Sequence, residues 1–264
     1  MSEQSYRLIQ QGLVEDECVL DVQLAGGKGN ILNMAMMDEL RSLLDAHEGR
    51  KRLRLVLVRG ADKYFSYGAS VEEHVAERVP VMLPAFHGLI RAVAKYPVPI
   101  AALVRGRCLG GAFELVLACH LVFATPDALF ACPEIKLGVF PPVLAAIGAQ
   151  RLGGATAERL LLTGAELGAE EALRIGWLTA LLGAEAEPRE DVLAWYRANL
   201  KPLSAFSLRQ ATAAARECGP LARALGEPLD RAESLYLKEL GPSHDGNEGI
   251  AAFIEQRKPK WTHS

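Results

Sequence analysis

The sequence predicts an α/β protein that carries an α-rich C-terminal part. In the first part of the chain, strand-like and helix-like segments follow one another. The strand-like segments are short and either rich in β-forming residues or alternately apolar and polar, and the helix-like segments have apolar residues at helical spacing. From Thr156 onward, helical patterns dominate. Half of the 264 residues are hydrophobic and 23% are charged, as in a globular chain with a large aliphatic core. We therefore expect an α/β core over residues 1–185 and a helical region over residues 186–264 that pads the core or packs against other chains.

The first predicted elements are a strand, a helix and a second strand. Residues 17–24 alternate apolar and polar side chains over their second half, which predicts a half-buried strand, and the glycine-rich residues 25–30 end it. Residues 33–46 place apolar side chains at helical spacing, and Asn33 can cap that helix. Residues 53–58 (LRLVLV) predict the second strand.

A loop and a second helix–strand pair follow. Residues 60–70 are punctuated by glycine, and residues 85–95 have one apolar helical face. Residues 97–104 (PVPIAALV) predict a strand with prolines at its start, and the unbroken apolar run indicates burial on both faces. A loop over residues 105–110 leads to a helix over about residues 111–118.

The rest of the chain is predicted to be mostly helical. Residues 120–124 and 177–182 are strand-like. Helical patterns cover residues 189–200, 203–218, 221–240 and 248–257. No low-complexity linker separates these parts, so tethered independent domains are not expected.

Composition argues against several classes of function. The 29 basic and 32 acidic residues give a net charge of −3, which offers no general attraction for nucleic acid. No apolar stretch reaches the about 20 residues that span a bilayer, and the N-terminus lacks a secretory signal, so we expect a cytoplasmic protein with no membrane partner. The five scattered cysteines predict buried thiols in a reducing compartment. The six histidines share no metal-ligand spacing, so we expect no metal site.

Two glycine-rich turns follow predicted strands, at residues 64–70 and 106–114. Glycine removes the Cβ that would block a ligand and leaves backbone N–H groups free, so the two turns together can form a two-donor cradle for an oxyanion. The second turn also begins a helix, whose first N–H groups favour negative charge. Two alternatives stay open at this point. One is a dinucleotide site, for which the G-x-G-x-x-G spacing is missing, and the other is a pair of ordinary tight turns.

Two glutamates lie between apolar neighbours. Glu114 falls in the first turn of the predicted helix 111–118, where an ordinary acid would complement the helix dipole. Glu134 lies within residues 130–138 (FACPEIKLG), where an ordinary acid would be a solvated turn residue. Partly desolvated carboxyls beside an oxyanion cradle would suit general acid–base catalysis, because burial raises a carboxyl pKa toward neutrality. Serine hydrolysis has less support, since the G-x-S-x-G motif is missing.

Six short motifs occur in a fixed order: residues 65–70 (FSYGAS), 98–115 (VPIAALVRGRCLGGAFEL), 133–138 (PEIKLG), 150–153 (QRLG), 161–164 (LLTG) and 248–253 (EGIAAF). Their order and intervals resemble those of the enoyl-CoA hydratase/isomerase (crotonase) superfamily, from about residue 17 to about residue 261. The resemblance implies a crotonase-like spiral of repeated ββα units and a C-terminal helical region that builds trimers or dimers of trimers. It also implies a coenzyme A thioester as substrate, with no separate cofactor.

The resemblance further implies roles for four residues. By position, the N–H groups of Ala69 and Gly111 look like the oxyanion hole that accepts the thioester carbonyl. Glu114 and Glu134 fall at the two carboxylate positions of the family's hydratases. Isomerases typically keep one of the two acids, so the presence of both favours addition or removal of water. One acid would take a proton from the attacking water, and the other would deliver a proton to carbon.

Further residues are expected to bind the substrate. Lys28 and Lys63 are candidates for holding the phosphates of coenzyme A, and Lys258 is a candidate for reaching the site of a neighbouring subunit. Pro141 and Pro142 would stiffen the backbone beside the second glutamate and shape the acyl pocket. The predicted substrate-binding set is completed by Ser66, Tyr67, Gly68 and Gly110.

Departures from the family pattern narrow the predicted substrate. Ser70 and His120 stand where many relatives have Asp. Residues 138–150 (GVFPPVLAAIGAQ) are longer than the glycine-rich segment of simple enoyl-CoA hydratases. Together with residues 65–74 (FSYGASVEEH), this variant resembles the cyclohexa-1,5-diene-1-carbonyl-CoA hydratases of anaerobic aromatic-ring (benzoyl-CoA) degradation. Hydration would then give 6-hydroxycyclohex-1-ene-1-carbonyl-CoA.

Two alternatives to this function are considered. The first is hydration of a linear enoyl-CoA, or dehydration on a carrier-protein thioester, which a comparison of substrates would distinguish. The second is a non-catalytic acyl-CoA-binding or RNA-binding scaffold. Intact Glu114 and Glu134 argue against a non-catalytic protein, and the lack of a long basic run argues against RNA.

Overall fold

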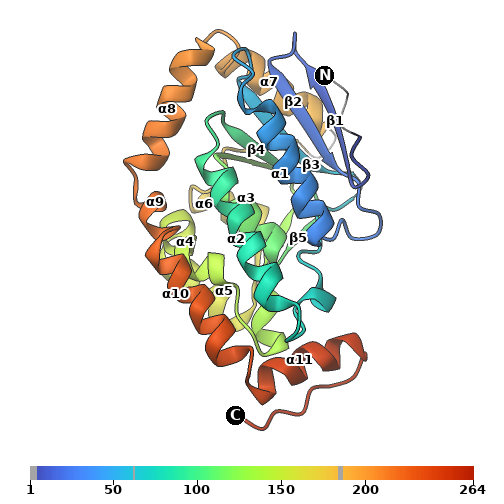
Figure 1. The fold of residues 1–264 in the computed structure, drawn as a ribbon. Coiled ribbons are helices and arrows are strands. Elements are labelled where there is room, and N and C mark those ends of the chain that lie inside the picture. Colours follow the sequence, from blue (N-terminus) through green and yellow to red (C-terminus); the bar gives the residue numbers. More distant parts are fainter. Residues whose placement is uncertain (1–4, 62, 184–186) are drawn as a thin grey trace.

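The computed structural model describes residues 5–61, 63–183 and 187–264. In this part of the chain the strands form two sheets, with helices packed around them (Figure 1). The larger sheet has the order β1-β2-β3-β4-β6-β9, with β1 (Ile9–Val14), β2 (Val19–Leu24), β3 (Leu55–Gly60), β4 (Ile100–Val104), β6 (Leu121–Ala124) and β9 (Ala180–Leu181). Strand β1 is antiparallel to β2, and the other pairs in this sheet are parallel.

Successive residues of the central strands bury opposite faces of this sheet. In β3, Val56 and Val58 join the main hydrophobic core, whereas Leu55 and Leu57 join a second cluster. Strands β2 and β4 divide their side chains in the same way. This is the period-two geometry of a strand that is covered on both sides, and the predicted burial of residues 97–104 on both faces is confirmed for β4.

Helices cover the two faces. On the main-core side lie α1 (Met34–Glu48) and α2 (Val79–Lys95), and α7 (Pro188–Asn199) supplies much of the second cluster. The predicted cap of α1 is confirmed, because the Asn33 side chain accepts a hydrogen bond from the Met36 N–H at 2.9 Å.

The smaller sheet contains β5 (Arg107–Leu109), β7 (Leu129–Ala131) and β8 (Glu166–Gly168), in the order β5-β7-β8. The chain passes from a strand of the larger sheet to one of the smaller sheet and then into a helix, first as β4-β5-α3 (Gly111–Ala118). It repeats this with β6, β7, the 3-10 turn η2 (Pro133–Leu137) and α4 (Pro142–Leu152). Helices α5 (Gly154–Thr163) and α6 (Ala169–Arg174) follow. The predicted spiral of ββα units is confirmed.

The C-terminal part is a series of helices, as predicted. After α7 come α8 (Ala205–Glu217), α9 (Pro220–Ala224), α10 (Glu227–Leu235), the π-helical turn η3 (Tyr236–Leu240) and α11 (His244–Ile254). Helices α9 to α11 contribute Leu221, Leu229 and Ile250 to the main core. Helix α8 lies at the margin of the molecule (Figure 1). Its Phe206 side chain is exposed. The predicted boundary at residue 185 lies outside the described residues.

Several predicted elements have different bounds in the structure. The helix predicted over residues 248–257 is α11, which begins at His244 and ends at Ile254. Helix α2 begins at Val79, and Pro84 lies inside it, at the cost of one backbone hydrogen bond near the start of the helix. The helix predicted over residues 221–240 is divided at Gly226 into α9 and α10. The strand predicted over residues 177–182 shortens to β9. The loop predicted over residues 105–110 is wrong in part, because it contains strand β5. The sequence patterns also missed strands β1, β7 and β8. All four strands are short or carry exposed polar residues, which leaves little alternation to detect.

Candidate active site

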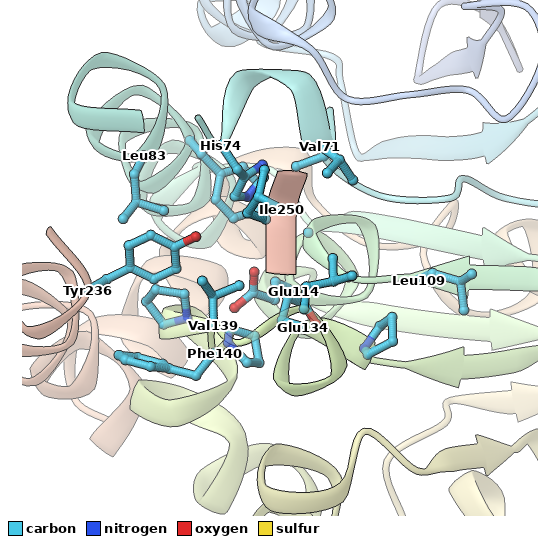
Figure 2. A pocket seen from close by; sticks show the side chains of 18 of the residues that line it. Val71, His74, Leu83, Leu109, Glu114, Glu134, Val139, Phe140, Tyr236 and Ile250 are labelled. Atoms are coloured by element: carbon cyan, nitrogen blue, oxygen red, sulfur yellow. The ribbon is translucent and has the colours of Figure 1, made fainter. Parts of the chain in front are cut away.

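A cavity of about 280 Å³ lies where α2, β5, α3, η2, η3 and α11 meet (Figure 2). Among the described residues, its wall is mostly aliphatic and aromatic, and its polar side chains are those of Tyr67, His74, Glu114, Glu134 and Tyr236. Ala69, Gly110 and Gly111 line the same space. The fold therefore brings both glycine turns and both glutamates of the sequence prediction to one cavity.

Glu114 lies on α3 but is held by a different helix. Its side chain is buried, with 3% of the residue exposed. One carboxylate oxygen, Oε1, accepts hydrogen bonds from the N–H groups of Val143 (2.7 Å) and Leu144 (2.9 Å) in the first turn of α4. Pro142 begins α4 and has no N–H, so these are the first donors that α4 can offer. Burial raises the pKa of Glu114 to about 7, although the two hydrogen bonds oppose the rise.

Glu134 lies on η2, beside the second glycine turn. A Cβ at Gly110 would come within 2.8 Å of Glu134 Oε1, so the absence of a side chain at Gly110 makes room for this carboxyl. The other oxygen, Oε2, is buried with no hydrogen-bond partner among the described residues. Burial raises the pKa of Glu134 above its usual value, and the neighbouring Glu114 raises it further. The charge of each acid therefore opposes ionisation of the other. Glu114 lies in the first turn of α3, as an ordinary acid would, but its carboxylate accepts from α4 instead. Glu134 is not the solvated turn residue of the ordinary alternative, because its Oε2 is buried.

The amides of Ala69 and Gly111 are neighbours on the cavity wall. A Cβ built on Gly111 would lie 3.3 Å from Ala69 Cβ and 3.5 Å from Ala69 N. Gly111 is the first residue of α3, so its N–H has no acceptor within the helix. Within the described parts of the chain, neither N–H donates to a backbone or side-chain group. Two free donors thus lie side by side, as an oxyanion hole requires.

Ser66 and Gly68 fix the backbone of the first glycine turn, which carries the Ala69 amide. A Cβ on Gly68, whose φ is +100°, would lie 2.6 Å from the Leu109 carbonyl oxygen, so only glycine permits this approach of the two turns. The Ser66 hydroxyl is fully buried, donates to the Asn30 carbonyl at 2.7 Å and accepts from the Gly68 N–H at 3.1 Å. The Ser66 hydroxyl therefore helps to fix the first turn, and Ser66 is not among the described residues that line the cavity. Its expected contact with the substrate stays a prediction.

The other predicted substrate-binding residues separate into two groups. Pro141 and Pro142 line the cavity, as does Tyr67, which is 42% exposed and stacks on Tyr64 with ring centroids 4.8 Å apart. The lysines at 28, 63 and 258 are exposed and lie outside the cavity wall. Their predicted contacts with coenzyme A phosphates stay predictions.

Two polar residues of the cavity were missed as site residues. His74 lies after the first turn, and its Nδ1 is 2.7 Å from the Ser70 carbonyl oxygen. Burial lowers the pKa of His74, which favours the neutral form of this side chain, although the contact with the Ser70 carbonyl opposes the shift. Tyr236 comes from η3, more than 100 residues beyond Glu114. It falls within a segment that the sequence predicts as one continuous helix, so no local pattern marks it.

Further groups of the described residues bear on alternative chemistry. No three His, Cys, Asp or Glu side chains among them are grouped as a metal ion requires. In the same residues, no helix combines the length and apolar character of a membrane span.

Four of the five cysteines are buried, as predicted, and Cys218 is exposed. Burial raises the pKa of Cys108, beside the second glycine turn, well above the usual range, so this thiol is a poor nucleophile.

Comparison with known proteins agrees with this geometry. The profile of the family described as enoyl-CoA hydratase/isomerase matches residues 15–264. The chain belongs to the enoyl-CoA hydratase/isomerase family. Its similarity to the family's members extends over nearly the whole length. A cyclohexa-1,5-dienecarbonyl-CoA hydratase of Thauera aromatica is 43% identical over 94% of this chain and 95% of its own, and a probable enoyl-CoA hydratase of Bacillus subtilis is 30% identical over 94% and 97%.

Solved structures share the fold of this chain. An enoyl-CoA hydratase from Mycobacterium avium subsp. paratuberculosis superposes with a TM-score of 0.80 at 26% identity, over 98% of this chain and all of that one. A methylmalonyl-CoA decarboxylase complexed with 2S-carboxypropyl-CoA gives 0.86 at 23% identity, over 99% of this chain and all of that one. Because a decarboxylase has the same fold, the fold alone does not select the reaction. The side chains in the cavity must do so.

Proposed function

We propose that this chain adds water to a conjugated cyclic acyl-CoA thioester, cyclohexa-1,5-diene-1-carbonyl-CoA, to form 6-hydroxycyclohex-1-ene-1-carbonyl-CoA. One observation carries the proposal: Glu114 and Glu134 share an apolar cavity with the free amides of Ala69 and Gly111. The 43% identity to the Thauera aromatica hydratase supports the choice of substrate. The apolar wall suits a hydrocarbon ring.

The two amides would hold the thioester oxygen. When water attacks the β-carbon, negative charge moves onto that oxygen, and fixed N–H donors stabilise the charge where it develops. Loss of one such donor typically costs about 3–4 kcal/mol of transition-state stabilisation. The Gly111 N–H also belongs to the positive end of the α3 dipole. The oxyanion hole would therefore supply the largest electrostatic contribution to the stabilisation of the transition state.

The carboxyl pair would move the protons. One carboxylate takes a proton from water as the oxygen bonds to the β-carbon, which leaves a delocalised dienolate. The other carboxyl then gives a proton to the vinylogous ring carbon. Overall, one O–H bond of water and one C=C π bond break, while one C–O and one C–H bond form. Burial raises the pKa of Glu114 and of Glu134, and the charge of Glu114 opposes a second charge on Glu134. A pair that shares one proton provides the acid and the base that hydration needs.

The proposal extends to the rest of the thioester and to assembly. Lys28, Lys63 and a neighbouring subunit's Lys258 would approach the coenzyme A phosphates, and no further cofactor takes part. A homotrimer or a dimer of trimers is supported by the apolar surface of α8, where Phe206 is 72% exposed. A cytoplasmic location suits a protein that keeps free thiols such as Cys108.

The test compares substrates on the purified protein. The cyclic dienoyl-CoA and crotonyl-CoA are supplied side by side, and water addition is followed by the change in ultraviolet absorbance as one conjugated double bond of each substrate is lost. We expect faster turnover of the cyclic substrate, and Glu134→Gln should abolish turnover of both. Faster turnover of crotonyl-CoA would assign the chain to linear enoyl-CoA hydration, and binding without any water addition would support the scaffold alternative.

A further inference from the structure

Tyr236 presents a buried, unpartnered hydroxyl to the cavity. The residue is 3% exposed, and its hydroxyl has no hydrogen-bond partner among the described residues. Figure 2 shows the hydroxyl pointing into the cavity, toward the side where the Glu114 carboxylate lies. A buried hydroxyl without a partner destabilises the folded protein, so a ligand oxygen is the simplest explanation for a polar atom at this position.

The position of Tyr236 is fixed by its surroundings. Its ring meets Phe140 edge to face, with centroids 5.8 Å apart and an interplanar angle of 61°. The residue begins the π-helical turn η3, a type of turn that occurs frequently at functional sites. One turn earlier, the Glu233 carboxylate accepts from His87 Nδ1 at 2.5 Å, which ties α10 to α2. These contacts hold the hydroxyl in the cavity before any ligand binds.

The chemistry of the proposed substrate limits what this hydroxyl can bind. The thioester oxygen would be taken by Ala69 and Gly111, and the remainder of the acyl group is a hydrocarbon ring. The one further oxygen at the acyl end is that of the attacking water, which becomes the ring hydroxyl of the product. Burial raises the pKa of Tyr236, as do the charges of Glu134 and Glu114, so the phenol stays protonated and can donate.

We propose that Tyr236 binds the oxygen that is added to the ring, first as water and then as the product hydroxyl. This proposal rests on the proposed hydration of a cyclic acyl thioester. The phenol O–H donates to a lone pair of the water, which leaves the water's own hydrogens free for the carboxylate that acts as base. Tyr236 would thus connect the C-terminal helical region to the position at which the new C–O bond forms.

The test is a binding experiment that needs no turnover. In a Glu134→Gln background, calorimetry measures the affinities for cyclohexanecarbonyl-CoA and for 2-hydroxycyclohexane-1-carbonyl-CoA, with and without Tyr236→Phe. We expect Tyr236→Phe to weaken binding of the hydroxylated ligand about tenfold and to leave the affinity for the other ligand unchanged, since one hydrogen bond is lost. Tyr196→Phe, which removes another buried phenol oxygen in the second hydrophobic cluster, should alter neither affinity.

Kinetics give a second, independent measurement on the otherwise unaltered enzyme. Tyr236→Phe should lower kcat for the cyclic dienoyl-CoA about tenfold with little change in KM, because the dienoyl ring carries no oxygen for Tyr236 to bind. Equal losses for both ligands, or no loss for either, would overturn the proposal. Failure of the wild-type protein to hydrate the cyclic substrate would instead refute the proposed function, and the difference between the two ligands would still report on Tyr236.

Discussion

Replacing Glu114 by Gln should remove a pH-dependent cost from the folded protein. The amide oxygen of Gln can still accept the N–H groups of Val143 and Leu144, so the perturbation is mainly one of charge. Burial moves the pKa of Glu114 from 4.5 to about 7 in the folded state. The folded state then binds more protons than the unfolded state between these two pH values, so stability falls as pH rises through this window. At about 1.4 kcal/mol per pH unit, the cost reaches about 3 kcal/mol once Glu114 is ionised.

Urea unfolding at about pH 5 and about pH 8.5 measures this cost, with both proteins at the same concentration. We expect the free energy of unfolding of Glu114→Gln to increase relative to that of wild type by on the order of 2–3 kcal/mol when the pH is raised from about 5 to about 8.5. Glu158→Gln, which removes an exposed carboxylate, is the matched control and should follow the wild-type pH dependence. If wild type and Glu114→Gln respond to pH in parallel, Glu114 titrates normally and the argument for a shared proton fails.

Three further outcomes follow from the same geometry. Glu114→Gln should lower kcat for hydration by about 10²–10⁴-fold with little change in thioester affinity, as single-turnover and binding assays would measure. Gly110→Ala should lower stability by about 1–3 kcal/mol and reduce activity, because the new Cβ would lie 2.8 Å from Glu134 Oε1 on a backbone with φ of +51°; unchanged thermal stability would contradict this. Ser66→Ala should cost about 1–3 kcal/mol of folding stability by leaving the Gly68 N–H without its acceptor, and should lower kcat more than it raises KM; the reverse pattern would support Ser66 as a substrate contact.

Local patterns were sufficient for the central elements of the fold. Residues 97–104 are apolar without interruption, and β4 is buried on both faces because parallel strands are covered by helices on each side. Asn33 caps α1 because a side-chain oxygen there can reach an N–H three residues on, which is a purely local event. In contrast, β7 and β8 are only three residues long, and their existence depends on pairing with each other and with β5.

The sequence alone determined the alternation of the α/β core, the two glycine turns and the motif order that identifies the family, since each is set by neighbouring residues or by fixed intervals. Tertiary structure decided which groups share a space. It placed Glu114 under the N-terminus of α4, brought Glu134 against Gly110, joined the Ser66 hydroxyl to the Asn30 carbonyl and added Tyr236 from the far end of the chain. Burial and the approach of distant charges set the pKa of a carboxyl, and both quantities exist only after the chain has folded.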